Sequence, residues 1–267
     1  MVAELGFSVQ NRVMLHHLHR YINCAKPRKH YSMINCIAHL QHLFKPQPNL
    51  IFMSFFITFE GIEGSGKSTQ LQRLHEHLHV LGYQVATTRE PGGCPISDVI
   101  RTLLLDPEND KMASRTELLL YGAARAQHVV EFIRPTLAAG KIVLCDRFSD
   151  ATIVYQGAGR GLEMTQLQAI DHFATDGLIP DLTLLLDYPA EAGLQRARER
   201  NHFDDLESEG RFELESLAFH QRIRQGYLDL AAREERFHII DALGDVETVA
   251  KSINAVIDRF FASRRPA

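Results

Sequence analysis

The sequence predicts a doubly wound α/β fold, in which helices cover both faces of a parallel sheet of five strands. Two observations carry this prediction. From Met53 onward short β-rich segments alternate with helical patterns, and the first strand runs through a glycine-rich loop directly into a helix. Strands that alternate with helices at this spacing are joined by right-handed crossovers and lie parallel. We therefore expect one domain over residues 53–267.

Five segments have the short, apolar, β-rich composition of buried strands. They are Phe55–Phe59, Tyr83–Thr88, Lys141–Cys145, Asp181–Asp187 and Phe237–Ile240. The expected helices are Lys67–Leu81, Ile96–Leu105, Arg115–Ala138, Pro189–Arg200, Glu213–Arg233 and Val246–Phe261. In the first helix Leu71, Leu74 and Leu78 repeat on one face, and Gly82 ends it. Pro189 falls in the first turn of its helix, where its missing N–H costs nothing.

The composition excludes several classes of function. The net charge of −4 argues against non-specific binding to nucleic acid, because no excess of cations is available to neutralise phosphates. No apolar run reaches the roughly 20 residues of a membrane-spanning helix, so we expect a soluble protein without membrane contact. The four cysteines show no C-x-x-C spacing, which predicts neither a disulfide framework nor a metal knuckle and fits the cytoplasm.

Residues 1–52 differ from the rest of the chain. They carry a net charge of +5 and six of the 14 histidines, so the remainder is clearly acidic. Three interpretations stay open. The functional chain starts at Met53 and the extension reflects a mis-assigned start codon; or the extension is a disordered or partner-binding arm; or it is an organellar transit peptide, although arginine and serine are few.

A phosphate-binding motif lies between the first strand and the first helix. Residues 61–68 read G-I-E-G-S-G-K-S and fulfil G-x-x-x-x-G-K-[ST] in full. Backbone N–H groups and the positive end of the helix would hold a β-phosphate there. Lys67 can reach the β- and γ-phosphates, and the Ser68 hydroxyl can bind Mg²⁺. The expected ATP-binding residues are Gly61, Ile62, Glu63, Gly64, Ser65, Gly66, Lys67, Ser68 and Thr69. The loop alone does not choose among GTPases, transport ATPases and kinases.

Further motifs follow this loop in order. They are T-R-E-P-G-G at 88–93, Y-G-A-A-R-A-Q-H at 121–128, D-R-F at 146–148 with Y-Q-G at 155–157, and R-A-R-E-R at 196–200 with R-F-E at 211–213. Together they resemble the thymidylate kinase family, from about Met53 almost to the C-terminus. The resemblance implies a P-loop NTPase fold and a homodimer. It also implies that ATP, with Mg²⁺ as cofactor, phosphorylates dTMP to dTDP for dTTP synthesis.

The resemblance assigns an acceptor site to eight residues. They are Glu63, Arg89, Tyr121, Arg125, Arg147, Thr152, Tyr155 and Gln156. Glu63 would accept a hydrogen bond from the deoxyribose 3′-OH, unless it only complements the helix dipole. Arg89 and Arg147 each follow the end of a strand, where open α/β sheets bind ligands, and two guanidinium groups suit a 5′-phosphate. Exposed ion pairs are the alternative for these arginines.

The base contacts are also implied by the resemblance. Tyr121 and Arg125 lie four residues apart on one helical face, where the family stacks an aromatic ring on thymine and bonds the base through arginine. Tyrosine stands here where phenylalanine is usual, and a plain core position is the alternative. Ala151 replaces a common serine, which leaves Thr152 as the hydroxyl donor beside Tyr155-Gln156.

The predicted lid, at about residues 196–212, decides the subtype. Position 64 is glycine, so the loop offers no catalytic arginine and the chain resembles the bacterial type with lid arginines. The expected catalytic residues are Lys67, Arg147, Arg196, Arg198 and Arg200. A solvated basic helix face remains the alternative for the lid arginines. Ser68 and Asp146 are the expected metal ligands, with Asp187 a weaker candidate.

Two rival functions stay open. A deoxynucleoside kinase would need a general base for a hydroxyl acceptor, whereas paired arginines favour an acceptor that carries a phosphate. A P-loop switch or transport ATPase would hydrolyse nucleotide without any acceptor and would leave the T-R-E-P-G-G and lid motifs unexplained.

Overall fold

The computed structural model describes residues 54–203 and 210–264 of the chain. The predicted extension at 1–52 lies outside these residues, as do residues 204–209 of the predicted lid. We describe only the unit that begins at Phe52.

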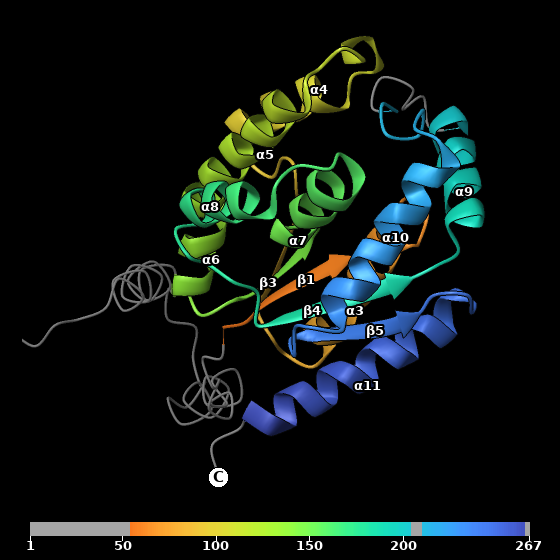
Figure 1. The fold of residues 1–267 in the computed structure, drawn as a ribbon. Coiled ribbons are helices and arrows are strands. Elements are labelled where there is room, and N and C mark those ends of the chain that lie inside the picture. Colours follow the sequence, from red (N-terminus) through yellow and green to blue (C-terminus); the bar gives the residue numbers. More distant parts are fainter. Residues whose placement is uncertain (1–53, 204–209, 265–267) are drawn as a thin grey trace, which may run out of the picture. The chain divides into compact units, whose positions relative to one another are not determined.

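A parallel sheet of five strands forms the centre of this unit, in the order β2-β3-β1-β4-β5 (Figure 1). The strands are β1 (Phe56–Glu60), β2 (Val85–Arg89), β3 (Ile142–Asp146), β4 (Leu182–Asp187) and β5 (Phe237–Asp241). All residues of β1 are buried, because helices cover both faces of the sheet at its centre. The predicted doubly wound fold is confirmed. In this order the strands β2 and β3 lie on one side of β1, and β4 and β5 lie on the other. The connections therefore run to opposite sides of β1, and a crevice opens there at the carboxyl ends of the strands.

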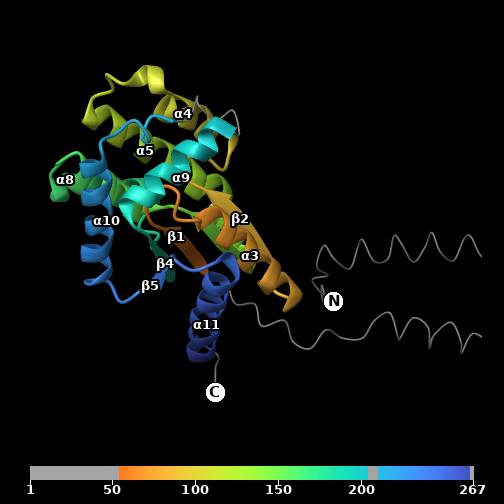
Figure 2. The same cartoon turned by 90° about the vertical axis from the view of Figure 1, so that its right-hand side faces the viewer.

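Helices α3 (Lys67–Val80) and α11 (Val246–Arg264) pack together on one face of the sheet (Figure 2). The opposite face carries α6 (Arg134–Ala138) against β3 and α10 (Leu217–Ala231) against β4 and β5. Phe56, Val143 and Phe148 fill the space beneath the segment that leads into α6. Helices α4 (Pro95–Leu105) and α5 (Ser114–His128) lie side by side beyond this layer (Figure 1). A short 3₁₀ turn, Pro107–Asn109, follows α4.

Residues 149–159 and 164–175 are helical, although we predicted no helix in this part of the sequence. The segment contains α7 (Ser149–Thr152), the π-helical turn η3 (Ile153–Gly159) and α8 (Met164–Thr175). Helix propensity is low in this segment, which contains glycines at 157, 159 and 161 and the β-branched pair Ile153-Val154. The sequence therefore did not indicate a helix. Packing of η3 against α10 overrides that local preference.

Three of the predicted helices also differ from expectation. The helix predicted at Arg115–Ala138 contains a π-helical stretch at Val129–Ile133, because Pro135 has no N–H for the carbonyl four residues before it. Helix α9 (Ala190–Phe203) starts after Pro189, whose carbonyl accepts from the Gly193 N–H. Helix α10 starts at Leu217, because the Ser216 side chain caps it by accepting from the Phe219 N–H.

Within residues 54–203 and 210–264, every helix is too short or too polar to cross a membrane.

Candidate active site

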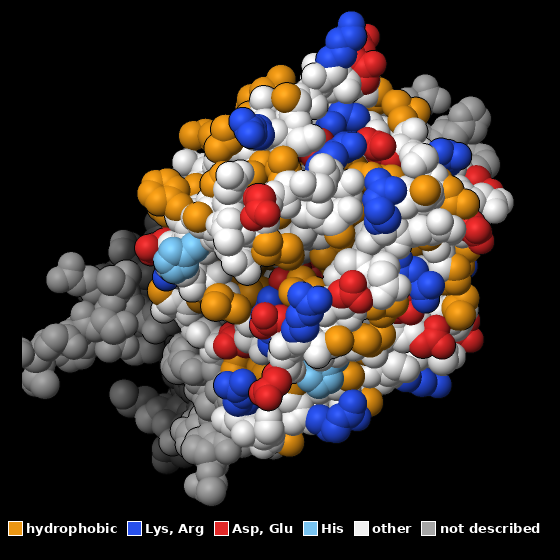
Figure 3. Space-filling model, viewed as in Figure 1, with side chains coloured by type: hydrophobic (Ala, Val, Ile, Leu, Met, Phe, Trp, Pro, Cys, Tyr) orange, Lys and Arg blue, Asp and Glu red, His pale blue; other side chains and the backbone are white. Residues whose placement is uncertain are grey.

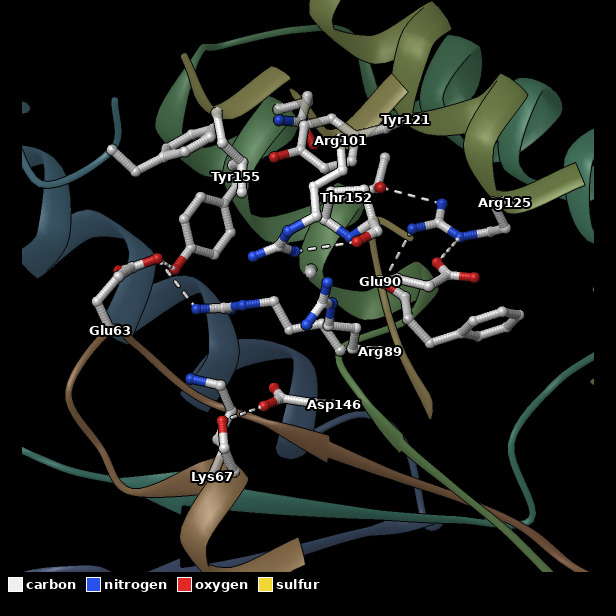
Figure 4. Close-up of a pocket in the computed structure, with 18 of the residues that line it drawn as sticks. Glu63, Lys67, Arg89, Glu90, Arg101, Tyr121, Arg125, Asp146, Thr152 and Tyr155 are labelled. Atoms are coloured by element: carbon white, nitrogen blue, oxygen red, sulfur yellow. Dashed lines mark hydrogen bonds and ion pairs between the residues drawn. The ribbon is translucent and has the colours of Figure 1, made fainter. Parts of the chain in front are cut away.

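A cavity of about 590 Å³ opens at the carboxyl ends of β1, β2 and β3 (Figure 4). The glycine-rich loop and the start of α3 form one wall of it, through Glu63, Gly64, Lys67 and Ser68. The opposite wall comes from β2, α5 and η3. The predicted site residues on that wall are Arg89, Tyr121, Arg125, Arg147, Thr152, Tyr155 and Gln156. Phosphate loop and predicted acceptor residues therefore share one cavity.

The backbone of the loop explains why glycine stands at position 64. Gly64 has a φ of +70°, and a Cβ built there would lie 2.1 Å from the Gly193 carbonyl oxygen in α9. No side chain fits at this distance, so the loop has no place for an arginine of its own.

Lys67 is buried and turns back over the loop. Its Nζ donates to the carbonyl oxygens of Gly61 at 3.1 Å and Ile62 at 2.7 Å. Burial and then the nearby Arg147 lower the pKa of Lys67 to about 8, against the opposing pull of the surrounding carboxylates. The ammonium remains charged at neutral pH and lies at the loop that would hold phosphate.

The metal ligands predicted at Ser68 and Asp146 lie together. The Ser68 hydroxyl donates to Asp146 Oδ2 at 2.7 Å, across the gap between α3 and β3. Among the described residues no three His, Cys, Asp or Glu side chains group as a metal cage, at this place or at any other. A hydroxyl and one carboxylate fit Mg²⁺, which keeps several waters and takes its other ligands from phosphates. Asp187 is engaged otherwise, because Arg224 binds both of its carboxylate oxygens.

Glu63 projects from the loop into the cavity and is held from several sides. Its Oε1 accepts from Arg147 Nη2 at 3.0 Å and from the Tyr155 hydroxyl. Its Oε2 lies 3.3 Å from His220 Nδ1 and accepts no aligned hydrogen bond. Burial alone would raise the pKa of Glu63, but Arg147 and then His220 and Lys67 hold it well below its ordinary value. Glu63 is therefore an ionised carboxylate.

Arg147 occupies the left-handed region with a φ of +66°, directly after β3. Its Nη1 donates to the Gly61 carbonyl at 2.9 Å and to the Tyr227 hydroxyl at 3.1 Å. Its guanidinium also lies 5.0 Å from the centre of the Tyr155 ring. These contacts aim the cation at the cavity between the loop and the acceptor wall.

Behind Arg147 lies a buried carboxyl group, Glu60. It accepts from the Phe148 N–H at 2.8 Å and from the Tyr227 hydroxyl at 2.7 Å. Burial and then the charge of Asp150 raise the pKa of Glu60 from 4.5 to about 7, although Arg147 opposes the shift.

This raised pKa predicts a stability that falls with pH. Between the two values the folded state holds a proton on Glu60 that the unfolded chain releases, so rising pH favours unfolding. At about 1.4 kcal/mol per pKa unit, Glu60 should lower the free energy of unfolding by up to about 3 kcal/mol across this pH range. We expect Glu60→Gln to abolish this pH-dependent contribution. Urea unfolding from about pH 5 to about pH 8 measures it. Parallel curves for both proteins would contradict the assignment.

Arg125 is placed at the cavity but is almost wholly engaged in the protein. Its Nε donates to Glu90 at 2.7 Å, its Nη1 to Thr152 Oγ1 at 3.0 Å and to Asp171 at 2.8 Å. Its Nη2 donates once, to the Phe148 carbonyl at 3.0 Å. Since a guanidinium has five N–H donors, one remains for a ligand. Spacing on a helix could not show that Arg125 also fixes three neighbouring segments.

The other predicted acceptor residues divide by exposure. Arg89 is 58% exposed on its side chain and lies 3.9 Å from Asp98, so it is free to turn toward a phosphate. Gln156 is buried and donates from Nε2 to Glu117 at 2.9 Å, which fixes the orientation of its amide. The ring of Tyr121 lines the cavity from α5.

The three lid arginines of α9 go to different places. Arg200 lines the cavity and lies 3.5 Å from Glu213. Arg196 packs over the Tyr188 ring at 4.4 Å, and Arg198 donates to the Glu213 backbone carbonyl. Although Arg196 and Arg200 share a helical face, only Arg200 of the three arginines lines the cavity.

Several residues of the site lay outside the predicted set. Glu117 is buried in α5, bound to Arg160 at 3.2 Å and to Arg211 at 2.7 Å. It thereby joins the lid end to the amide of Gln156. Tyr227 and His220 come from α10, which carries no motif we recognised. Glu117 likewise belongs to no motif that we identified in the sequence.

A phosphate-binding loop that faces cationic acceptor residues across one cavity, on a parallel sheet, is the arrangement of a nucleoside-monophosphate kinase. The thymidylate kinase family model matches residues 59–253. The chain is 56% identical over 202 residues to the thymidylate kinase of Syntrophotalea carbinolica, covering 75% of this chain and 94% of that protein. The thymidylate kinase of Geotalea uraniireducens is 55% identical over 206 residues, with 77% and 97% covered.

The fold agrees with a solved structure. The crystal structure of thymidylate kinase from Ehrlichia chaffeensis superposes with a TM-score of 0.61 at 35% identity, covering 77% of this chain and 99% of that one. The chain belongs to the thymidylate kinase family.

Proposed function

We propose that the protein phosphorylates dTMP to dTDP, with Mg²⁺-bound ATP as the phosphoryl donor. One observation carries the proposal: Glu63 and Arg147 bind each other across the same cavity that the phosphate loop lines. A carboxylate that can accept from a sugar hydroxyl and an arginine that can bind a phosphate suit an acceptor that carries both groups, whereas a water molecule would need neither.

The donor side uses the loop and α3. The loop N–H groups and the N-terminus of α3 would bind the β-phosphate of ATP, and Lys67 would move from the loop carbonyls to the phosphates. Ser68 and Asp146 would hold Mg²⁺, which neutralises phosphate charge when bound.

The acceptor side uses the opposite wall. Arg147 and the exposed Arg89 would bind the two negative charges of the dTMP phosphate. The Glu63 carboxylate, which lines the cavity, would accept a hydrogen bond from the 3′-OH. Tyr121 would stack on thymine, and the fixed amide of Gln156 would meet the edge of the base with Thr152, Tyr155 and the last donor of Arg125.

In the reaction a phosphate oxygen of dTMP attacks the γ-phosphorus of ATP. The new P–O bond forms as the bond to the β-phosphate oxygen breaks, and the electron pair leaves with ADP. The phosphate oxygen is already anionic, so no general base is required. The chain's task is to position the two phosphates and to balance their charge.

We assign the lid cation to Arg200, because it alone of the three α9 arginines lines the cavity. Arg200→Ala is expected to lower kcat by about 10²–10³, in line with the loss of one group that stabilises transition-state charge. Arg196→Ala, whose side chain packs on Tyr188, is the matched control and should change kcat little. Equal losses in both variants would reject the assignment.

The partner would be a second copy of the chain. Exposed apolar side chains run along the neighbouring helices α4, α5 and α8 and the π-helical stretch that follows α5, where hydrophobic atoms gather in Figure 3. They are Ile96, Val99, Leu103, Leu119, Val130 and Phe173. A patch of this kind on a soluble domain marks an interface, and a symmetric dimer would bury it away from the cavity. Sedimentation velocity tests this, and a monomer at all concentrations would contradict it.

With Cys94 and Cys145 free and buried, the cytoplasm is the compartment we propose.

The proposed activity is tested by ADP production with dTMP, dUMP, dCMP, AMP and thymidine offered in parallel. We expect turnover with dTMP and none with thymidine, because thymidine lacks the phosphate that Arg147 would bind. Turnover of thymidine or AMP with none of dTMP would sink the proposal. ADP release at the same rate with and without an acceptor would indicate an ATPase instead.

A further inference from the structure

Tyr227 lies in α10 and is almost completely buried, at 1% exposure. Its hydroxyl donates to Glu60 Oε2 at 2.7 Å and accepts from Arg147 Nη1 at 3.1 Å. Glu60 ends β1 and Arg147 follows β3, so one oxygen of α10 connects the carboxyl ends of two paired strands. Arg147 lines the cavity and Tyr227 does not, so any effect of Tyr227 on a ligand has to act through another residue.

The direction of both hydrogen bonds follows from the groups involved. A guanidinium only donates, so the Tyr227 oxygen must accept from Arg147. The hydroxyl hydrogen is then left for Glu60, and an oxygen of a carboxyl group can accept it in either protonation state. Burial and then the nearby Glu60 raise the pKa of Tyr227 well above its ordinary value, so the hydroxyl keeps the hydrogen that it donates.

These contacts decide which donors of Arg147 remain for a ligand. Nη1 uses both of its hydrogens, on the Tyr227 hydroxyl and on the Gly61 carbonyl, and Nη2 uses one on Glu63. The three bonds leave two donors, Nε and the second hydrogen of Nη2. Two donors of one guanidinium can bind a phosphate bidentately, provided that the group does not turn. Without the Tyr227 hydroxyl, one hydrogen of Nη1 would lose its partner and the guanidinium could turn away.

The backbone at Arg147 is held from the same side. Arg147 has a φ of +66°, a conformation that a residue other than glycine keeps only where its surroundings impose it. Glu60 Oε1 accepts from the Phe148 N–H at 2.8 Å, while Glu60 Oε2 accepts from Tyr227. The Arg147 N–H donates to the Phe59 carbonyl at 2.9 Å. Glu60 and Tyr227 together therefore fix both the backbone and the side chain of Arg147.

We propose that Tyr227 is a positioning residue, whose hydroxyl, anchored on Glu60, holds the guanidinium of Arg147 in the orientation that binds the phosphate of the acceptor. The proposal rests on the proposed function, because it takes a nucleotide that carries a phosphate as the ligand of Arg147. It adds that recognition of this phosphate depends on a buried hydroxyl behind the cavity wall.

Paired binding measurements on the full-length chain test this. The dissociation constants of dTMP and of thymidine, which lacks the phosphate, are measured for the wild type and for Tyr227→Phe. Phenylalanine keeps the ring and removes only the hydroxyl. We expect Tyr227→Phe to weaken dTMP binding about tenfold, the worth of one hydrogen bond to a charged group, and to leave thymidine binding unchanged. In steady-state kinetics the KM for dTMP should rise, while kcat and the KM for ATP stay close to wild type.

Tyr83→Phe is the matched control, because the Tyr83 ring packs on Phe261 and does not line the cavity. It should bind both ligands as the wild type does. An equal loss for dTMP and thymidine in Tyr227→Phe, or no loss for either, would show that Tyr227 only packs and would overturn the inference. The proposed function would still stand if the wild type turned over dTMP, and it would fail separately if the wild type did not.

A second measurement does not depend on how Tyr227→Phe folds. Side-chain ¹H–¹⁵N spectra of the wild type report whether the Arg147 guanidinium rotates, with Arg147→Lys used to assign its signals. We expect separate signals for Nη1 and Nη2 without any ligand, because hydrogen bonds on both nitrogens hold the group in place. A single averaged signal would show a freely turning guanidinium and would contradict the positioning role.

Discussion

Lys67→Ala is expected to lower kcat by about 10²–10³, the loss that follows removal of one preorganised group at a developing charge. The Lys67 ammonium lies among the loop carbonyls at 2.7 and 3.1 Å, at the place where the γ-phosphate of ATP would arrive. No other lysine in the described chain lines the cavity, so nothing replaces it. The KM for dTMP should change little, because the acceptor wall is untouched.

Steady-state kinetics with both substrates varied measures this effect. Lys111→Ala is the matched control, since Lys111 is an exposed lysine remote from the cavity lining. The wild-type kcat/KM for ATP, which reports the free protein, should also fall above about pH 8 as Lys67 loses its proton, because its pKa is lowered to about 8. Near-normal turnover in Lys67→Ala would show that the loop lysine does not act on the phosphates.

Arg147→Ala is expected to raise the KM for dTMP by about 10², with a smaller effect on the KM for ATP. Truncating one partner of a buried charge pair costs about 2–5 kcal/mol in binding, because the other charge is left unpaired. Here the pair is Arg147 and Glu63, at 3.0 Å, and dTMP would meet both. Without the guanidinium the acceptor phosphate faces a carboxylate instead of a cation.

Two comparisons separate binding from folding in this variant. Arg147→Lys keeps the charge but loses the fork that reaches both Gly61 and Glu63, so it should recover only part of the affinity. Arg134→Ala removes an arginine that is paired with Asp176 at the surface, and it should behave as wild type. An unchanged KM for dTMP in folded Arg147→Ala would remove Arg147 from the acceptor site.

The sequence predicted the architecture well because local signals and topology agree. Glycine-rich turns, Leu71, Leu74 and Leu78 on one face of α3, and continuous apolar strands all specify the same doubly wound sheet. The helices between residues 149 and 175 were not predicted. They are stabilised by packing against α10 and α5, which are long-range contacts that local helix propensity does not reflect.

The site was predictable where a residue carries its own motif. Lys67, Ser68 and Arg147 follow from the loop and from D-R-F, and the parallel strands bring them to one edge of the sheet. Tyr227 and His220 were not predictable, because they meet Arg147 and Glu63 only after α10 folds across the sheet. The division of labour among the lid arginines likewise depends on where α9 sits beside the loop, which spacing alone cannot show.

The central claim is that one cavity brings ATP and dTMP together for direct transfer. Incubation of the full-length protein with Mg²⁺, dTMP and ATP labelled at the γ-phosphate, followed by separation of the nucleotides, tests this most directly. We predict that the label appears in the β-phosphate of dTDP as ADP forms in equal amount. Label found in inorganic phosphate while dTMP stays unchanged would contradict the account.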